Sequence, residues 1–402
     1  MRGSIVSPKV AMKRLRLLAV LASIAVLAAC ATAPLPTPAQ APLHLFQDDA
    51  FEAPSHRIAA AEVFALSPAM ERYLEVEIAP QLRRLGRQRG LVDALYSTAQ
   101  LRLDFDTDTT RTAAEAFEAR AGNCLSLVVM TAALAKHLDL PIQYQALIGQ
   151  ESWSRSGDLS FVNGHVNITV ARRLVDRLAA FDADTQLRLD FGVLPVGRGS
   201  LLQAVSESTI VAMFMNNRAA EALARGDVAD AYAYAREAVL REPGYVGAYN
   251  TLGVVYQRRG LAEAAERVYR HALDRDADHR AALLNLSRLL AGQGRSAEAA
   301  PWRARLARLE AEPPFQHFDL GRAAAQAGDF RAAREHILRE MRRDPDYHEF
   351  HFWLAVALYG LGEVEQAREH LTTAMKNSTT RREQAIYAAK LQRLAPATSR
   401  AQ

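Results

Sequence analysis

The sequence predicts an α+β domain at residues 46–205, followed by an all-α solenoid of helical hairpins at residues 206–378. Two observations predict this division. Between residues 164 and 191, apolar and polar residues alternate in two short runs with the two-residue period of β-strands, and segments with helical spacing precede them. From residue 226 onward, glycines instead recur every 34 residues, which is the period of a repeat architecture.

The first 29 residues have the pattern of an export signal. Basic residues at positions 13, 14 and 16 precede an apolar run from Leu17 to Ala29, which is too short to span a bilayer. An ordinary secretory signal is one interpretation. The ending Leu-Ala-Ala-Cys also resembles a bacterial lipobox, which implies that Cys30 receives lipid and that Met12 is the true start.

The residues after Cys30 extend this resemblance. Ala31 is similar to the residue found in lipoproteins sent to the outer membrane, which implies a protein of the bacterial cell envelope facing the periplasm. Residues 30–45 are rich in Pro and Ala and are therefore expected to form an extended tether. The expected membrane contact is the lipid anchor at Cys30.

Composition excludes several function classes. Removal of residues 1–29 leaves 44 basic and 45 acidic side chains, so no nucleic-acid partner is expected. If Cys30 carries lipid, Cys124 has no partner for an intramolecular disulfide. The sequence has neither a phosphate-binding glycine loop nor a zinc ligand set, so we expect no cofactor and no metal.

The repeats are predicted to be five helical hairpins. Small residues at fixed offsets from each glycine allow two helices to approach closely, and the glycine makes the turn between them. The period is that of tetratricopeptide repeats. A last helix within residues 379–396 is expected to cap the stack. The repeat glycines are Gly226, Gly260, Gly294, Gly328 and Gly362.

A solenoid of this kind is expected to bind a protein or peptide. Asn217, Asn250 and Asn285 recur near one position of the hairpin and are the candidate partner-binding residues. We expect Tyr249 and Tyr256 to pack between repeats instead. The pair of histidines at positions 348 and 351 lacks the spacing of a metal-binding helix, so a packing or partner-facing role is expected.

Cys124 is the candidate nucleophile of the α+β domain. Apolar spacing from Leu125 to Leu138 is helical, and Asn123 is a good N-cap. The first turn of a helix favours an anion, so a lowered thiol pKa is expected. The alternative is a buried structural thiol, because free cysteines are among the most buried residues.

His165 is the candidate base, and Asp190 is the candidate for the carboxylate that orients it. His137 lies too far along the same helix to reach Cys124, and no pattern places His44 or His56. His165 and Asp190 each stand opposite the apolar side of a predicted strand, so pairing of these strands in one antiparallel sheet would bring them together. Asp182 and Asp184 remain alternatives for the third member.

Four sequence segments resemble the transglutaminase-like superfamily, relatives of papain-type cysteine enzymes. They are TAAEAFEARAGNCLS at 112–126, LDLPI at 138–142, NGHVN at 163–167 and LDF at 189–191, and the similarity covers about residues 90–195. The resemblance implies that Cys124 is the nucleophile, His165 the general base and Asp190 the orienting acid. Asp139 departs from the pattern, because a helix-ending glycine is common there.

Two functions follow as expectations. The first is a lipid-anchored periplasmic cysteine enzyme that acts on peptide or isopeptide bonds by hydrolysis or acyl transfer through a thioester, with the repeats docking a partner or substrate. The second is a catalytically inactive lipoprotein in which the repeats serve as a protein-binding adaptor.

Overall fold

The computed structural model describes residues 40–96, 101, 103–106, 109–148, 152–156, 159–163, 165–172, 186–191, 201–309, 315–342, 344–378 and 381–394. The chain divides into two units, residues 1–40 and Ala41–Gln402. The expected signal peptide, Cys30 and the alternative acids Asp182 and Asp184 lie outside the described residues. No helix among the described residues is both long and apolar enough to cross a bilayer.

The helices of the α+β part begin and end where the sequence supplies caps. Thr112 and Glu115 form a capping box at the start of α5 (Ala113–Ala119), and Ser67 caps α2 (Pro68–Arg72). The long central helix is α6 (Cys124–His137). The other helical elements are η1 (Leu43–Leu45), η2 (Asp48–Ala50), η3 (Ala60–Glu62), the π-helical turn η4 (Tyr73–Glu77), α3 (Ala79–Leu85) and α4 (Arg87–Tyr96).

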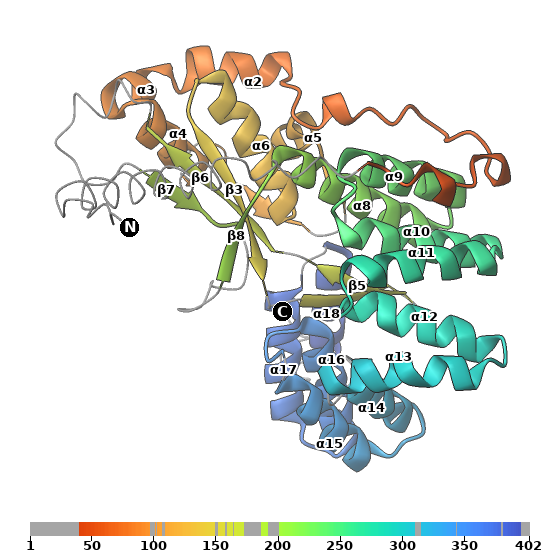
Figure 1. Cartoon of the computed structure of the whole chain (residues 1–402). Coiled ribbons are helices and arrows are strands. Elements are labelled where there is room, and N and C mark those ends of the chain that lie inside the picture. The colour runs from red at the N-terminus through yellow and green to blue at the C-terminus, as the bar shows by residue number, and fades with distance from the viewer. Residues whose placement is uncertain are drawn as a thin grey trace, which may run out of the picture. The chain divides into compact units, whose positions relative to one another are not determined.

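A four-stranded antiparallel sheet packs on α6, in the order β7-β6-β3-β8 (Figure 1). The strands are β3 (Ile142–Ile148), β6 (Val166–Ala171), β7 (Gln186–Leu189) and β8 (Leu201–Val205). Two small pairs complete the strands: β1 (Asp104–Phe105) with β2 (Ala121–Gly122), and β4 (Ser152–Ser156) with β5 (Leu159–Asn163). Every residue of β6 is buried, so the face that carries Asn167 and Thr169 is covered as well as the apolar face.

Asp139 explains its departure from the family pattern through its backbone. It has a φ of 54°, the left-handed conformation that glycine adopts most easily. Among non-glycine residues, aspartate and asparagine tolerate this conformation best. Asp139 therefore ends α6 in the way that a glycine would.

The C-terminal region is a tetratricopeptide-repeat solenoid of helical hairpins, as predicted (Figure 1). All five repeat glycines have φ between 78° and 87° and end the first helix of a hairpin or follow it closely, which confirms their role in the turn. The hairpins are α8 (Glu207–Arg225) with α9 (Val228–Arg241), α10 (Val246–Arg259) with α11 (Ala262–Arg275), α12 (Arg280–Gly292) with α13 (Ser296–Leu309), α14 (Gln316–Gln326) with α15 (Phe330–Met341), and α16 (His348–Gly360) with α17 (Val364–Asn377). Helix α18 (Arg381–Arg393) follows and packs on α17.

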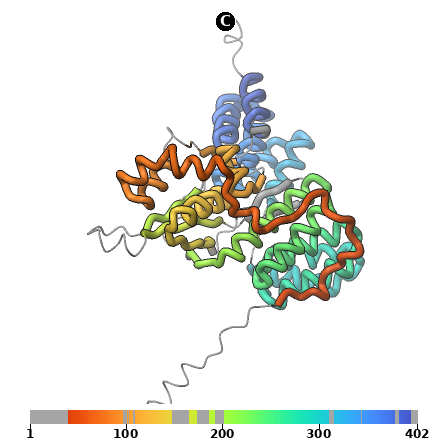
Figure 2. Tube along the Cα trace, turned by 90° about the horizontal axis from the view of Figure 1, so that it is seen from above, coloured from red at the N-terminus to blue at the C-terminus, as the bar shows by residue number. Residues whose placement is uncertain are grey.

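Residues 43–56, which we call the strap, lie along the first two repeats (Figure 2). The sequence assigned residues 46–56 to the α+β domain, but these residues contact α9 and α10 instead. The ring of Phe51 stacks on Tyr232 with centroids 4.0 Å apart and planes 4° from parallel. The Tyr256 hydroxyl donates to the carbonyl of Leu45 at 2.8 Å.

One hydrophobic core runs from the strap through the α+β part and the first three repeats. Helix α8 contributes to both sides of it, because its buried residues include Ile210 and Phe214 near the α+β part and Ala222 beside α9. A second core forms within the last two hairpins and α18. The α+β part and the first repeats thus share a packed interior, although the sequence predicts them as separate domains.

Candidate functional site

Cys124 is the first residue of α6, as expected from the sequence. The Asn123 side chain caps the helix: its Oδ1 accepts the backbone N–H of Ser126 at 2.9 Å and the Ser126 hydroxyl at 2.8 Å. Gly122 is required by close packing, because a Cβ there would lie 2.6 Å from Cβ of Ser126. The turn that presents the thiol is therefore tightly specified by its immediate neighbours.

His165 and Asp190 form a hydrogen-bonded pair. The register of β6 with β7 pairs Ile168 with Leu189, which brings the residue before β6 close to the residue after β7. Nε2 of His165 lies 2.6 Å from Oδ1 of Asp190, and the two side chains are 18% and 27% exposed. The expected pairing of the two strands and of these two side chains is present.

The position of Cys124 beside β6 brings all three candidate residues into one neighbourhood. Helix α6 packs on β6, and backbone hydrogen bonds from Val166, the residue after His165, and from Leu125 act on the Cys124 sulfur. The charge of Asp190 also acts on this sulfur. The nucleophile, the base and the orienting acid therefore converge at the end of α6 nearest β6 and β7.

The pKa of Cys124 differs from the sequence expectation. Burial of the thiol raises its pKa, which outweighs the hydrogen bonds from Val166 and Leu125, and the negative charge of Asp190 adds to the rise. The first turn of the helix does favour the thiolate, but desolvation by the surrounding packing dominates. The expectation of a lowered pKa was wrong, and the resting thiol is protonated at neutral pH.

Aromatic and amide side chains that the sequence did not single out complete the surroundings. Tyr96 stacks on Phe191, with centroids 6.0 Å apart, and its hydroxyl donates to the backbone carbonyl of Asp190 at 3.4 Å. Asn167, next along the strand from the pair, is fully buried, and neither of its amide atoms bonds to a described residue. Its alternation with His165 was the only signal in the sequence for this position.

The candidate partner-binding residues lie partly exposed on the first helices of hairpins. The amide of Asn285 donates to Oδ1 of Asn250 at 2.9 Å, so these two side chains form a ladder between adjacent repeats. Asn217 is also partly exposed and lies on α8. Tyr249 and Tyr256 are fully buried, which confirms the expected packing role.

The histidines at the last hairpin pack inside it. His348 bonds to the Tyr387 hydroxyl at 2.9 Å, and His351 bonds both to His370 at 2.9 Å and to the carbonyl of Pro345 at 2.8 Å. Both are 7% exposed, so the packing alternative is the one observed. Within the segments of the chain that the structure describes, no group of three or more His, Cys, Asp or Glu residues is placed to hold a metal ion.

The fold and the site together define a helical-repeat protein that carries a Cys, His and Asp constellation on an α+β part. Comparison with known families supports the repeats: the family described as tetratricopeptide repeat matches residues 250–314 and 318–380. No match was found among curated proteins.

Solved structures with similarity to this chain include three repeat-containing proteins. YrrB, described as a TPR protein with an unusual peptide-binding site, is 20% identical over 44% of this chain and 92% of its own, with a TM-score of 0.24. The Pseudomonas aeruginosa protein PilF is 23% identical over 46% of this chain and 91% of its own, with a TM-score of 0.27. A thermophilic TPR protein of Thermus thermophilus is 16% identical over 45% of this chain and 99% of its own, with a TM-score of 0.30.

Proposed function

We propose that the protein is a transglutaminase-like cysteine enzyme that cleaves or transfers the acyl group of a peptide or isopeptide bond. The observation that carries the proposal is the 2.6 Å hydrogen bond between His165 and Asp190 beside the capped first turn that presents Cys124. The tetratricopeptide repeats suggest that a protein or peptide is bound by the solenoid.

The hydrogen bond assigns the protons of the imidazole. A carboxylate only accepts, so Nε2 of His165 carries a proton toward Asp190, and Nδ1 keeps the lone pair that accepts a proton. Nδ1 takes the proton of the Cys124 thiol as the sulfur attacks the substrate carbonyl carbon. The imidazolium then returns that proton to the departing amine as the C–N bond breaks, which leaves a thioester. Water or a second amine attacks the thioester, gives its proton to His165 and releases the thiol.

The raised pKa of Cys124 makes the base indispensable in this mechanism. A thiol that is neutral at rest becomes a nucleophile only as its proton leaves. Asp190 stabilises the imidazolium that forms, so the cost of separating charge in a half-buried site is lowered.

The cellular setting of the proposal comes from the sequence of the N-terminus. A lipid on Cys30 would anchor the enzyme in the outer membrane, facing the periplasm, and the solenoid would hold a periplasmic protein near the site. An oxidising compartment also gives a reason to keep only one thiol after lipidation.

Alkylation of the single thiol tests the catalytic proposal. We expect iodoacetamide to label Cys124 in the folded protein, and we expect His165→Ala to slow labelling at pH 7 by about 10-fold or more, since general-base assistance is typically worth at least 10²-fold in catalysis. Intact mass measures the label, and Cys124→Ser gives the background.

The matched control is His137→Ala, which removes a histidine at the far end of the same helix. Its labelling rate should equal that of the wild type. Equal rates in the wild type and His165→Ala would overturn the enzyme proposal.

The same result would favour the second candidate, a protein-binding adaptor with an inert thiol. The observation that supports this alternative is the raised pKa of Cys124, because desolvation also protects structural thiols from reaction.

A further inference from the structure

We infer that Thr110 and Glu221 are positioning residues for Cys124, so that helix α8 of the first repeat contributes to the support of the catalytic turn. The inference rests on the proposed function, since it assigns residues to the same site. It begins from the hydrogen bonds that hold the Asn123 cap.

The cap is held from outside its own helix. Nδ2 of Asn123 donates to Oγ1 of Thr110 at 2.8 Å, while Oδ1 of Asn123 serves the helix. One side chain thus connects the first turn of α6 to the segment at residues 109–111. The next residue of this segment adds a second connection, because the backbone N–H of Arg111 donates to the Ser126 hydroxyl at 2.8 Å.

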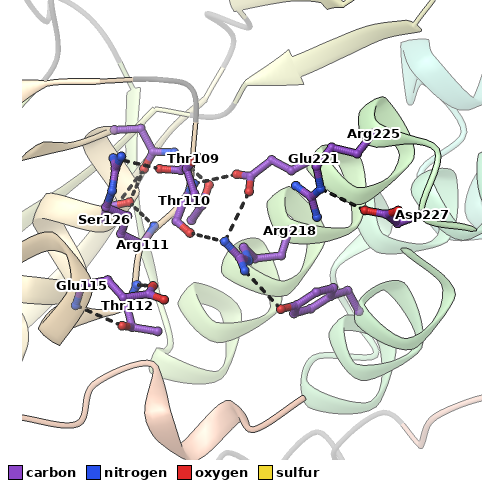
Figure 3. Close-up of polar contacts among 12 residues, drawn as sticks. Thr109, Thr110, Arg111, Thr112, Glu115, Ser126, Arg218, Glu221, Arg225 and Asp227 are labelled. Atoms are coloured by element: carbon purple, nitrogen blue, oxygen red, sulfur yellow. Dashed lines mark hydrogen bonds and ion pairs between the residues drawn. The ribbon is translucent and has the colours of Figure 1, made fainter. Parts of the chain in front are cut away.

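Thr110 is held in turn by α8. Its backbone N–H donates to Oε1 of Glu221 at 2.6 Å, and its carbonyl accepts from Nη1 of Arg218 at 3.3 Å. Figure 3 shows both side chains reaching from α8 toward Thr110. The two backbone groups of one residue are therefore bonded by two charged side chains from a single helix.

Burial makes these contacts stiff. Thr110 is fully buried, and the side chains of Arg218 and Glu221 are 20% and 16% exposed. Burial raises the pKa of Glu221, against the hydrogen bonds from Thr110 and the charge of Arg218. Hydrogen bonds from charged groups in a shielded place are stronger than those between neutral groups, and leaving one unmade is costly.

The chain of contacts continues to the strap. Nη2 of Arg218 donates to the Tyr234 hydroxyl at 3.4 Å, and this hydroxyl lies 2.7 Å from Nε2 of His56. His56 follows Ser55, which bonds to Asp230 through both its backbone and its hydroxyl at 2.6 Å. Helix α8 therefore connects the solenoid and the strap to the cap beside the nucleophile.

The direction of the cap determines the direction of the amides that face the sulfur. If Asn123 turns, the first-turn N–H groups lose their alignment, and the thiolate loses some of its stabilisation. Removal of the Thr110 hydroxyl or of the Glu221 acceptor should therefore raise the pH midpoint of Cys124 alkylation. A purely structural role would change stability without moving this midpoint.

The test compares iodoacetamide labelling rates from pH 6 to pH 10 in full-length variants. Thr110→Val removes the hydroxyl at constant shape, and Glu221→Leu removes the acceptor. We expect each to slow labelling at pH 7 by about 5-fold, the loss that corresponds to one capping hydrogen bond, and to move the midpoint upward. Thr110→Ser and Glu221→Gln keep the bonding atoms and should restore the wild-type profile.

Thr112→Val is the matched control, because it removes the cap of the neighbouring α5 and none of these contacts. It should lower stability and leave the midpoint unchanged. Arg218→Gln gives a second measurement at a more exposed side chain, in case a core variant fails to fold, and should also slow labelling. Wild-type profiles in Thr110→Val, Glu221→Leu or Arg218→Gln, together with His165-dependent labelling, would overturn this inference alone. Labelling that is independent of His165 in the parent protein would overturn the proposed function and the inference with it.

Discussion

Gly253 shows how one missing side chain sets the distance between two helices. A Cβ at this position would lie 2.3 Å from Cε1 of Tyr269, which is itself fully buried. By contrast, a Cβ at Gly292, in the last turn of α12, would meet no described heavy atom within 4 Å. The two glycines therefore have opposite reasons for their presence.

Alanine at these two glycines should have opposite effects. Gly253→Ala should destabilise the protein by about 1–3 kcal/mol, because overpacking forces Tyr269 out of place. Gly292→Ala should be neutral or stabilising by up to about 1 kcal/mol, because alanine favours the helix. Urea denaturation measures both, and a similar loss in the two variants would contradict this account.

At the residue scale, the sequence predicts identities better than environments. Alternation around His165 and Asp190 was sufficient to place them together, because strand pairing follows from local pattern. The pKa of Cys124 was predicted wrongly, because desolvation depends on which distant segments cover the sulfur. Thr110 carried no signal, since its role depends on a side chain 111 positions away.

At the scale of elements, His348 connects the last hairpin to the terminal helix. It lies on α16 and bonds to Tyr387 of α18, and Oε2 of Glu383 on α18 lies 3.5 Å from Nε2. Tyr347, which precedes it at the start of α16, is the neighbouring ring. Burial lowers the pKa of His348 to about 4, against an ordinary value near 6.5.

Acid should loosen this connection. The folded state binds fewer protons than the unfolded state, so the contribution of His348 is complete above about pH 6.5 and is lost as the pH falls toward 4. The loss should reach about 3 kcal/mol over this window. Hydrogen exchange of α16 and α18 at several pH values measures it.

His348→Gln should remove most of this pH dependence, whereas His137→Gln, on the exposed end of α6, should leave it intact. An unchanged acid response in His348→Gln would show that other groups control the opening of α18.

Elements differ in how far their sequence specifies them. The hairpins could be predicted, because the glycine turns and the small residues are local and repeat with one period. The burial of both faces of β6 could not be, since a polar residue such as Asn167 reads as solvent-facing until the covering segment is known.

At the scale of the whole molecule, the strap ties the N-terminal end of the α+β domain to the first two repeats. Its contacts join residues 175 to 211 positions apart. Asp48 illustrates their strength, because it accepts from the Tyr232 hydroxyl at 2.6 Å and pairs with Arg236 at 2.8 Å. The hydrogen bond from Tyr232 is the largest cause of the lowered pKa of Asp48.

Phe51→Ala should release the strap. Loss of the stacked ring removes an aromatic pair worth about 0.5–1.5 kcal/mol beyond its burial, so the backbone amides of Gln47 and Ser55 should exchange about 10-fold faster. Hydrogen exchange measures these amides. Phe64→Ala, which removes a ring beside Tyr144 in the α+β part, should leave them protected. Equal protection in Phe51→Ala and the wild type would mean that the polar contacts alone hold the strap.

The sequence could not predict the strap, because its residues carry neither a helical nor a strand period and their partners are far along the chain. A Pro- and Ala-rich segment followed by isolated aromatic residues reads as a linker. Only the tyrosines of the first two repeats reveal where it binds.

The strap also changes how the molecule responds to tension. A pull between a membrane-held N-terminus and a partner gripped by the repeats would pass through the contacts of Asp48, Phe51 and Ser55 directly into α9. The α+β part lies outside that route and would bear no load until those contacts peeled away. The strap therefore works as a strain relief for the segment that carries Cys124, His165 and Asp190.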